Sequence, residues 1–203
     1  MGSDWEWTDR KFGLSHQGRS GVLLEDGTEP GPALFDVGGG GHMHKSHRWQ
    51  DYDGKYGHPR AAALRGACSC GWRGETRYPL IWVTTDGEDW VKDAPTGDCS
   101  RDWSAHLEQV DAASAEVPDK LDKHVATLVR QLDDLSIDEP LTVLKVVERL
   151  ERQLKEVRQA TAYQVLSEQS RQEEGRSWEE IAAALALPVD QVQSRLLHYE
   201  RGR

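Results

Sequence analysis

Cysteine and histidine are the residues of this chain whose types and spacing suit metal chemistry best. Cys68 and Cys70 are separated by one residue, and His106 follows on a predicted helix. Thiolates and imidazoles are ligands that zinc prefers in tetrahedral structural sites, which close with four such groups. We predict a structural Zn²⁺ site built on Cys68, Cys70 and His106, with His58 or Cys99 as the fourth ligand. The alternative is three reduced cysteines that pack as small hydrophobic side chains.

The residues around these cysteines also carry a resemblance. Residues 68–74 read CysSerCysGlyTrpArgGly, and residues 103–107 read TrpSerAlaHisLeu. Together they resemble small zinc-ribbon-like proteins of high-GC bacteria that carry a CxCGWxG knuckle, over roughly residues 58 to 107. The resemblance implies a small α+β domain that gains stability from a metal, and a bacterial source. The CxC spacing departs from the usual CxxC, so both candidates for the fourth ligand stay open.

The carboxyl-terminal residues predict two short helices joined by a turn. Ser177 and Glu180 have the spacing of a capping box, which fixes a helix start at Trp178. Ile181, Ala182 and Leu185 would form the buried face of that helix, and LeuProVal at 187–189 would make the turn. The inner face of the following helix would then be formed by Val192 and Leu196.

Residues 177–203 resemble the helix-turn-helix of sigma-factor region four, in which an EEIAxxLxxPVxxVxSRL pattern precedes an outward-facing helix. The resemblance implies DNA binding, with the second helix in the major groove. Gln193, Asp190 and Ala186 depart from the usual residues, Ala186 standing where the turn glycine is common. Glutamine and arginine on that helix suit adenine and guanine edges. The resemblance assigns five side chains to the groove or its phosphates: Gln191, Gln193, Ser194, Arg195 and His198.

Between these regions the apolar spacing predicts two longer helices. After Pro118, leucines and valines recur in steps of four and three, and SerIleAspGluPro at 136–140 interrupts the pattern. A second helix begins at about Leu141 with the same alternation. The two helices would form an antiparallel hairpin, or the second would pair with its copy in a homodimer through residues 141–161. The apolar positions are Leu121, Val125, Leu128, Leu132 and Leu135, then Val143, Val147, Leu150, Leu154, Val157 and Thr161.

The expected fold is therefore mainly α with a small α+β zinc-ribbon-like unit, followed by a helical hairpin and a helix-turn-helix. Residues 1–54 are rich in glycine and histidine and predict a flexible arm, within which Val22, Leu23 and Leu24 suit a short strand. Residues 55–110 form the zinc-ribbon-like domain, 111–160 the hairpin, and 161–203 the helix-turn-helix domain. Within residues 55–110, a β-hairpin is expected around the CxC turn.

Composition narrows the function. No apolar run approaches the ~20 residues that cross a bilayer, and three cysteines are too few for a secreted disulfide framework, so we expect a cytoplasmic protein without membrane contact. The net charge of -10 opposes nonspecific attraction to nucleic acid. No catalytic motif is present, and we expect no enzyme.

The leading hypothesis is a DNA-binding transcriptional regulator. The alternative is an adaptor that uses its helices to bind another protein, such as the transcription machinery. A metal-dependent nuclease is a distant third, built on His42, His44, His47, Asp51 and Asp53.

Overall fold

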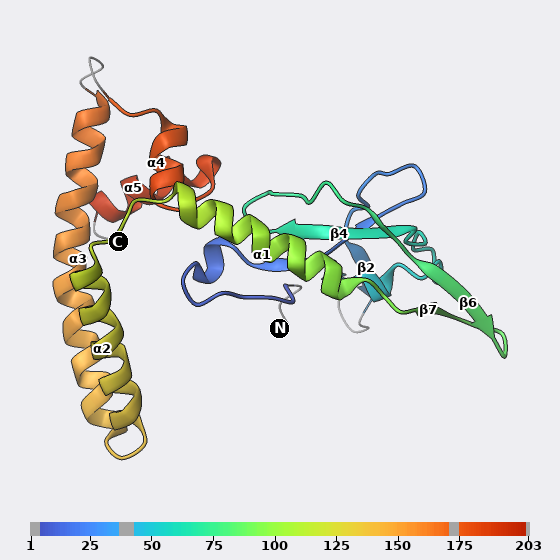
Figure 1. The fold of residues 1–203 in the computed structure, drawn as a ribbon, viewed down its shortest axis with the longest axis horizontal. Helices are drawn as coiled ribbons and strands as arrows, with labels where there is room; N and C mark the ends of the chain where they lie inside the picture. The colour runs from blue at the N-terminus through green and yellow to red at the C-terminus, as the bar shows by residue number, and fades with distance from the viewer. Residues whose placement is uncertain (1–4, 37–42, 171–174, 202–203) are drawn as a thin grey trace. The chain divides into compact units, whose positions relative to one another are not determined.

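The computed structural model describes residues 5–36, 43–170 and 175–201, and it divides the chain into two compact units, Met1–Ala112 and Ala113–Arg203 (Figure 1). Strands and one long helix build the first unit, whereas the regular elements among the described residues of the second are all helices. The fold is therefore mixed α+β, as the sequence predicts in outline. Four segments were expected, and the predicted boundary between residues 160 and 161 falls inside a continuous helix.

The first unit is organised around a three-stranded antiparallel sheet with β4 in the centre. It contains β1 (Gly18–Leu23), β4 (Ala63–Cys68) and β5 (Tyr78–Pro79). Two separate antiparallel pairs accompany the sheet: β2 (Ala33–Asp36) with β3 (Met43–Ser46), and β6 (Ile81–Thr85) with β7 (Glu88–Lys92). Two short 3₁₀ helices, η1 (Gly13–Ser15) and η2 (Trp49–Asp51), precede β1 and β4. Because β4 ends at Cys68 and turns back through residues 69–71 to pair with β5, the expected hairpin around the CxC turn is present.

Helix α1 (Thr96–Ala113) closes the first unit with one buried face. That face presents Cys99, Trp103, His106 and Leu107, whose spacing repeats about once per helical turn. Cys99 lies in the core with Val22 and Leu64, whereas Trp103 and Leu107 pack around Cys68. The middle of α1 therefore contacts the turn that carries the predicted metal ligands.

The expectation of a flexible arm over residues 1–54 differs from the structure, because β1 pairs along its whole length with β4. Val22 and Leu23 are buried in β1, as predicted for a short strand. The rest of that strand, Gly18 to Gly21, consists of glycine, arginine and serine rather than alternating apolar residues. A Cβ at Gly18 would lie 2.6 Å from the Trp103 ring, so glycine permits the close approach there. Glycines that allow close backbone packing give no hydrophobic periodicity. The sequence pattern therefore does not predict that this segment is an ordered strand.

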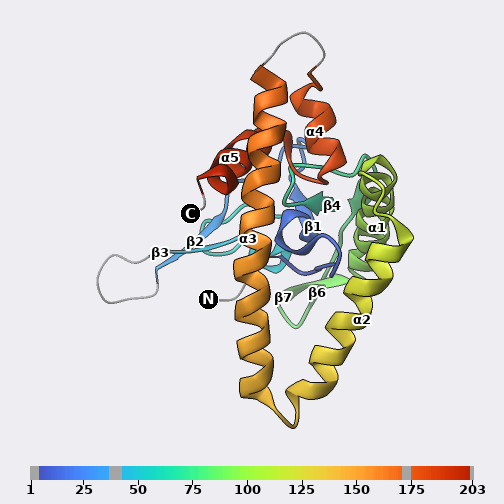
Figure 2. The same cartoon turned by 90° about the vertical axis from the view of Figure 1, so that its left-hand side faces the viewer.

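The second unit begins with a helical hairpin formed by α2 (Asp119–Ser136) and α3 (Pro140–Ser170). Figure 2 shows the two helices meeting at the turn that joins them and separating away from it. Leu132, Leu135 and Leu150 are half-buried near the turn, whereas Leu121 and Leu154 farther along are more than half exposed. The hairpin is therefore packed only at its closed end.

Helices α4 (Trp178–Ala184) and α5 (Val189–Glu200) pack against the other end of α3. Their shared core consists of Ile181, Ala182, Val192 and Leu196, together with Ala162 of α3. The predicted capping box is confirmed: the Glu180 amide donates to the Ser177 hydroxyl, and the Ser177 amide donates to the Glu180 carboxylate. Ala186, in the turn between the helices, has φ +49°.

In the part of the chain that the structure describes, no helix is long and apolar enough to cross a membrane.

Candidate metal centre

Four side chains with metal-binding atoms converge in the first unit. They are His16, Cys68, Cys70 and His106, and one ligand atom from each lies within 4.8 Å of all the others. His16, Cys68 and His106 are buried, and Cys70 is half-buried. The cluster can therefore hold a metal ion away from bulk water.

Three separate segments supply these ligands. Cys68 ends β4 and Cys70 stands in the turn after it, while His106 is on the buried face of α1. His16 directly follows η1 and comes two residues before β1. The register pairs Gly18 with Cys68, so the antiparallel pairing of β1 and β4 brings His16 to the CxC turn.

Ser69, the residue between the two cysteines, fastens the turn to the backbone beside His16. Its amide donates to the Gln17 carbonyl at 2.8 Å, and its hydroxyl accepts from the Gln17 amide at 2.9 Å. The same hydroxyl donates to the Ser15 carbonyl at 3.1 Å. These bonds hold the residues on both sides of His16, so they fix the distance between His16 and the cysteines.

Two of the interatomic distances in the cluster suit a tetrahedral ion. Zinc bonds of about 2.3 Å to sulfur and 2.0 Å to nitrogen place neighbouring ligand atoms roughly 3.3–3.8 Å apart in a tetrahedron. Cys68 Sγ lies 3.6 Å from His16 Nδ1, and Cys70 Sγ lies 3.3 Å from His106 Nε2. Two sulfurs and two nitrogens complete the coordination that closed structural zinc sites use.

The electrostatics of the cysteine pair favour one thiolate. A hydrogen bond from Cys70 holds the pKa of the Cys68 thiol far below its usual range, and His106 and His16 act in the same direction. Interaction with Cys68 raises the pKa of Cys70, and burial raises it further. The pair therefore retains a negative charge next to two imidazoles, which is the charge distribution that a divalent cation stabilises.

Aromatic rings enclose the cluster. The Trp72 ring stacks on the His106 imidazole with centroids 4.5 Å apart, and the Phe12 ring meets His16 edge-on at 5.5 Å. Trp103 is buried beside Cys68, as expected for a core residue. Rings that fix the imidazole planes support ligation by specific nitrogens.

The structure brings together three of the predicted ligands, Cys68, Cys70 and His106. The predicted fourth ligands, His58 and Cys99, do not lie in the cluster, and His16 takes that place. His58 packs against Phe35 with ring centroids 4.9 Å apart. Cys99 is fully buried in the core, where burial raises its pKa to about 12. Only the pairing of β1 with β4 identifies His16, and no motif around His16 signals it.

The second histidine set does not form a site among the described residues. His44, His47, Asp51 and Asp53 are not grouped around a common point, and Asp51 instead accepts a 2.5 Å hydrogen bond from Ser46. His42 lies outside the described residues.

The residues assigned to a DNA groove all lie on α5. Gln193, Ser194 and His198 are exposed, Gln191 and Arg195 are half-buried, and the buried side of the helix is formed by Val192 and Leu196. The polar residues therefore form a surface that is distinct from the packed face.

No protein-family model, curated protein or solved structure matches this chain.

Proposed function

We propose that this protein is a DNA-binding transcriptional regulator whose amino-terminal unit is stabilised by structural zinc. One observation carries the proposal: α5 buries Val192 and Leu196, while Gln193, Ser194 and His198 on its other side are exposed. A helix held firmly on one side and polar on the other is suited to enter a major groove.

The packing around α5 supports the proposal because it makes the helix rigid. Val192 is fully buried between α3 and α4, and the Arg158 guanidinium of α3 lies 4.7 Å from the centre of the Tyr199 ring. Residues 178–200 thus form two short helices supported by a third, which is the arrangement that a recognition helix needs. Gln193 and Arg195 offer the donors and acceptors that read base edges.

The charge of the chain sets the expected affinity. With 35 acidic and 25 basic residues, long-range attraction to phosphate is absent, so binding depends on a few local cations such as Arg195. We expect binding that depends only weakly on salt, because few phosphates are neutralised and the salt slope is therefore small.

The proposed zinc ion has a structural role. Four protein ligands leave no coordination position for a substrate, and structural zinc sites are closed in this way. The first unit is small, and the four ligands join its first strand, its central strand and its helix. Metal binding would therefore contribute directly to folding of that unit.

The test is DNA binding by the Arg195→Ala variant, measured by fluorescence anisotropy on selected and scrambled duplexes. We expect a loss of ~1–3 kcal/mol, confined to sites with the preferred base, if the guanidinium reads a base edge. Arg130→Ala is the matched control, because it removes the same charge from an exposed position on α2. Equal affinity of both variants and the wild type for every duplex would contradict DNA recognition by α5.

A protein-binding adaptor is a second candidate, favoured by the exposed apolar side chains of the hairpin, such as Val125 and Val157. If Arg195→Ala leaves DNA binding unchanged but abolishes binding to a purified component of the transcription machinery, the adaptor hypothesis replaces the regulator.

A further inference from the structure

The middle of the helical hairpin is exposed to solvent, although its sequence carries the apolar stripes of helices that pack against a partner. All ten residues from 151 to 160 of α3 are exposed, although α2 covers the helix before them and α4 and α5 cover it after them. On α2, every residue from 119 to 131 is exposed as well. Two helices with regular apolar stripes thus lack a partner over the same part of the hairpin.

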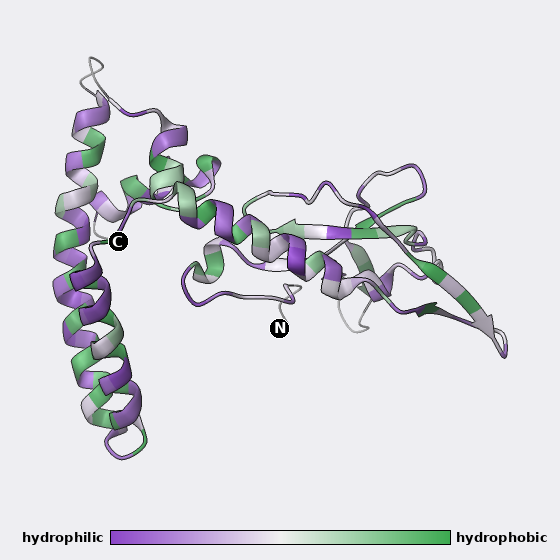
Figure 3. Ribbon diagram, in the orientation of Figure 1, coloured by the Kyte–Doolittle hydropathy of each residue, from purple (hydrophilic) through white to green (hydrophobic). Residues whose placement is uncertain are grey.

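The exposed side chains belong to those stripes. Leu121, Val125 and Leu128 lie in steps of four and three on α2, and Leu154 and Val157 continue the stripe of α3. Their exposed fractions range from 38% for Leu128 to 63% for Val157. Figure 3 shows hydrophobic residues recurring among hydrophilic ones along both helices. We define the open face as Leu121, Val125, Leu128, Val129, Leu154 and Val157.

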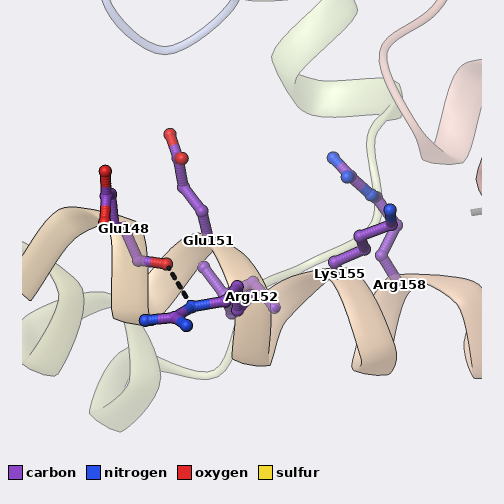
Figure 4. Close-up of a pocket in the computed structure, with 6 residues that line it drawn as sticks. Glu148, Glu151, Arg152, Lys155 and Arg158 are labelled. Atoms are coloured by element: carbon purple, nitrogen blue, oxygen red, sulfur yellow. Dashed lines mark hydrogen bonds between the residues drawn. The ribbon is translucent and has the colours of Figure 1, made fainter. Parts of the chain in front are cut away.

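Charged side chains border this face on α3. Figure 4 shows a shallow pocket on α3 lined by Glu148, Glu151, Arg152, Lys155 and Arg158, to which Leu154 also contributes. The Arg152 guanidinium donates to the Glu148 carbonyl along the helix. An apolar centre with a polar rim is the composition of protein interfaces.

We propose that the open face binds the open face of a second copy, so that two hairpins form an antiparallel four-helix bundle. A two-fold axis places α2 of one copy against α3 of its partner, which supplies to each helix the neighbour that it lacks. This proposal goes beyond DNA binding and does not depend on it. In a dimer that also binds DNA, two copies of α5 contact two half-sites.

The area supports a weak but specific dimer. Each open-face side chain exposes on the order of 60 Å² of apolar surface, since fully burying such a side chain removes roughly 100 Å². Two copies would together bury about 700 Å² of apolar surface, and interfaces of this kind are about 65% apolar. The implied total of about 1,100 Å² just exceeds the ~1,000 Å² expected of a specific interface.

The charge balance of the hairpin also permits self-association. Residues 119–170 contain ten acidic and eight basic residues, so their net charge is -2, whereas the whole chain has -10. Each helix carries charges of both signs, which limits repulsion between two copies.

The experiment is sedimentation equilibrium of the full chain without DNA, over about 1–100 μM. We expect a monomer–dimer equilibrium in this range. The double variant Val125→Glu with Val157→Glu places charges on the open face and should weaken dimerisation at least tenfold. Because both side chains are more than half exposed, the helical circular dichroism of the monomer should not change.

The matched control is Ile137→Glu, which adds a charge at a position 85% exposed in the turn, outside the open face. It should dimerise like the wild type. A wild type that stays monomeric at 100 μM, or a double variant that dimerises as well as Ile137→Glu, overturns the proposal. Neither result affects the Arg195→Ala test, so failure of the dimer and failure of DNA recognition are distinguishable.

Discussion

The three thiols of this chain occupy three different environments. Cys68 is buried among two imidazoles and a second thiol, Cys70 is half-buried, and Cys99 is fully buried in an apolar core. Desolvation disfavours a thiolate in the core, whereas neighbouring hydrogen-bond donors favour one at Cys68. Thiol reactivity therefore reports separately on the proposed metal site and on the core.

We predict stepwise labelling by a thiol-specific reagent at pH 8. The zinc-loaded native protein should react slowly at all three thiols, and chelation should release Cys70 and Cys68. Cys99 should react only after denaturation, since burial raises its pKa to about 12 and the thiolate is the reactive form. Equal labelling of all three thiols in the native protein before and after chelation would be incompatible with this site.

A second prediction concerns Gly66, opposite Ser20 in the central sheet. A Cβ there would lie 2.9 Å from the Cys99 carbonyl oxygen and 3.2 Å from the Trp72 ring. Gly66→Ala should therefore destabilise the first unit by ~1–3 kcal/mol through overpacking, as measured by urea denaturation followed by tryptophan fluorescence.

The control for this substitution is Gly97→Ala in the first turn of α1, where a Cβ meets no atom within 4 Å. It should be neutral or slightly stabilising, because alanine restricts the unfolded chain. If Gly66→Ala proves as stable as Gly97→Ala, the close packing of β4 on α1 is not as described.

Among individual residues, the sequence predicts which cysteines and histidines are candidate metal ligands better than it predicts which residue completes the site. Cys68, Cys70 and His106 stand out by type and spacing, and they do meet. His16 could not be found this way, because it reaches the site through strand pairing 52 residues away in sequence. Cys99 was a reasonable fourth ligand by type, but its position on α1 turns it toward the apolar core.

Among the elements, α4 has a favourable feature at its start and an unfavourable one in the turn that follows it. The capping box of Ser177 and Glu180 satisfies amides at the start of α4. Ala186, by contrast, adopts a left-handed conformation that residues other than glycine, asparagine and aspartate rarely populate. The turn sets the direction in which the chain enters α5, so the left-handed conformation of Ala186 is kept despite its strain.

We predict that Ala186→Gly stabilises the second unit by about 1 kcal/mol, because glycine adopts a positive φ without the Cβ conflict. Thermal unfolding followed at 222 nm measures this change. Ala183→Gly, inside α4, should destabilise by a similar amount, since glycine is unfavourable within a helix. Destabilisation by both substitutions would show that the turn does not have this conformation.

Helices are predicted from the sequence where apolar residues recur periodically or where a capping residue marks the helix start. The two stripes and the capping box predict α2, α3 and the start of α4 from the sequence. The hairpin of β6 and β7 was not predicted, although Asp86 and Gly87, both with positive φ, form the two-residue turn typical of such hairpins. In β1 the sequence indicates a strand only at Val22 and Leu23, because glycine, arginine and serine at the other positions give no apolar alternation.

At the scale of the whole molecule, the two proposed roles fall in units that are built differently. The first unit brings together residues far apart in sequence, since His16 and His106 belong to one cluster. Closing so long a loop is costly for a small unit, and a bound metal offsets that cost. The second unit is built around α3, which contacts both α2 and α5, and it presents the surfaces proposed for DNA and for a second copy.

The most direct test of the metal centre is the zinc content of purified protein by elemental analysis after dialysis, for the wild type, His16→Ala and His58→Ala. The wild type and His58→Ala should retain about one zinc per chain, whereas His16→Ala should lose most of it, because only His16 lies with the three other ligands. Tryptophan fluorescence of each variant serves as the check on folding. A wild type without zinc after expression in zinc-replete medium, or equal zinc in His16→Ala and His58→Ala, would contradict the site.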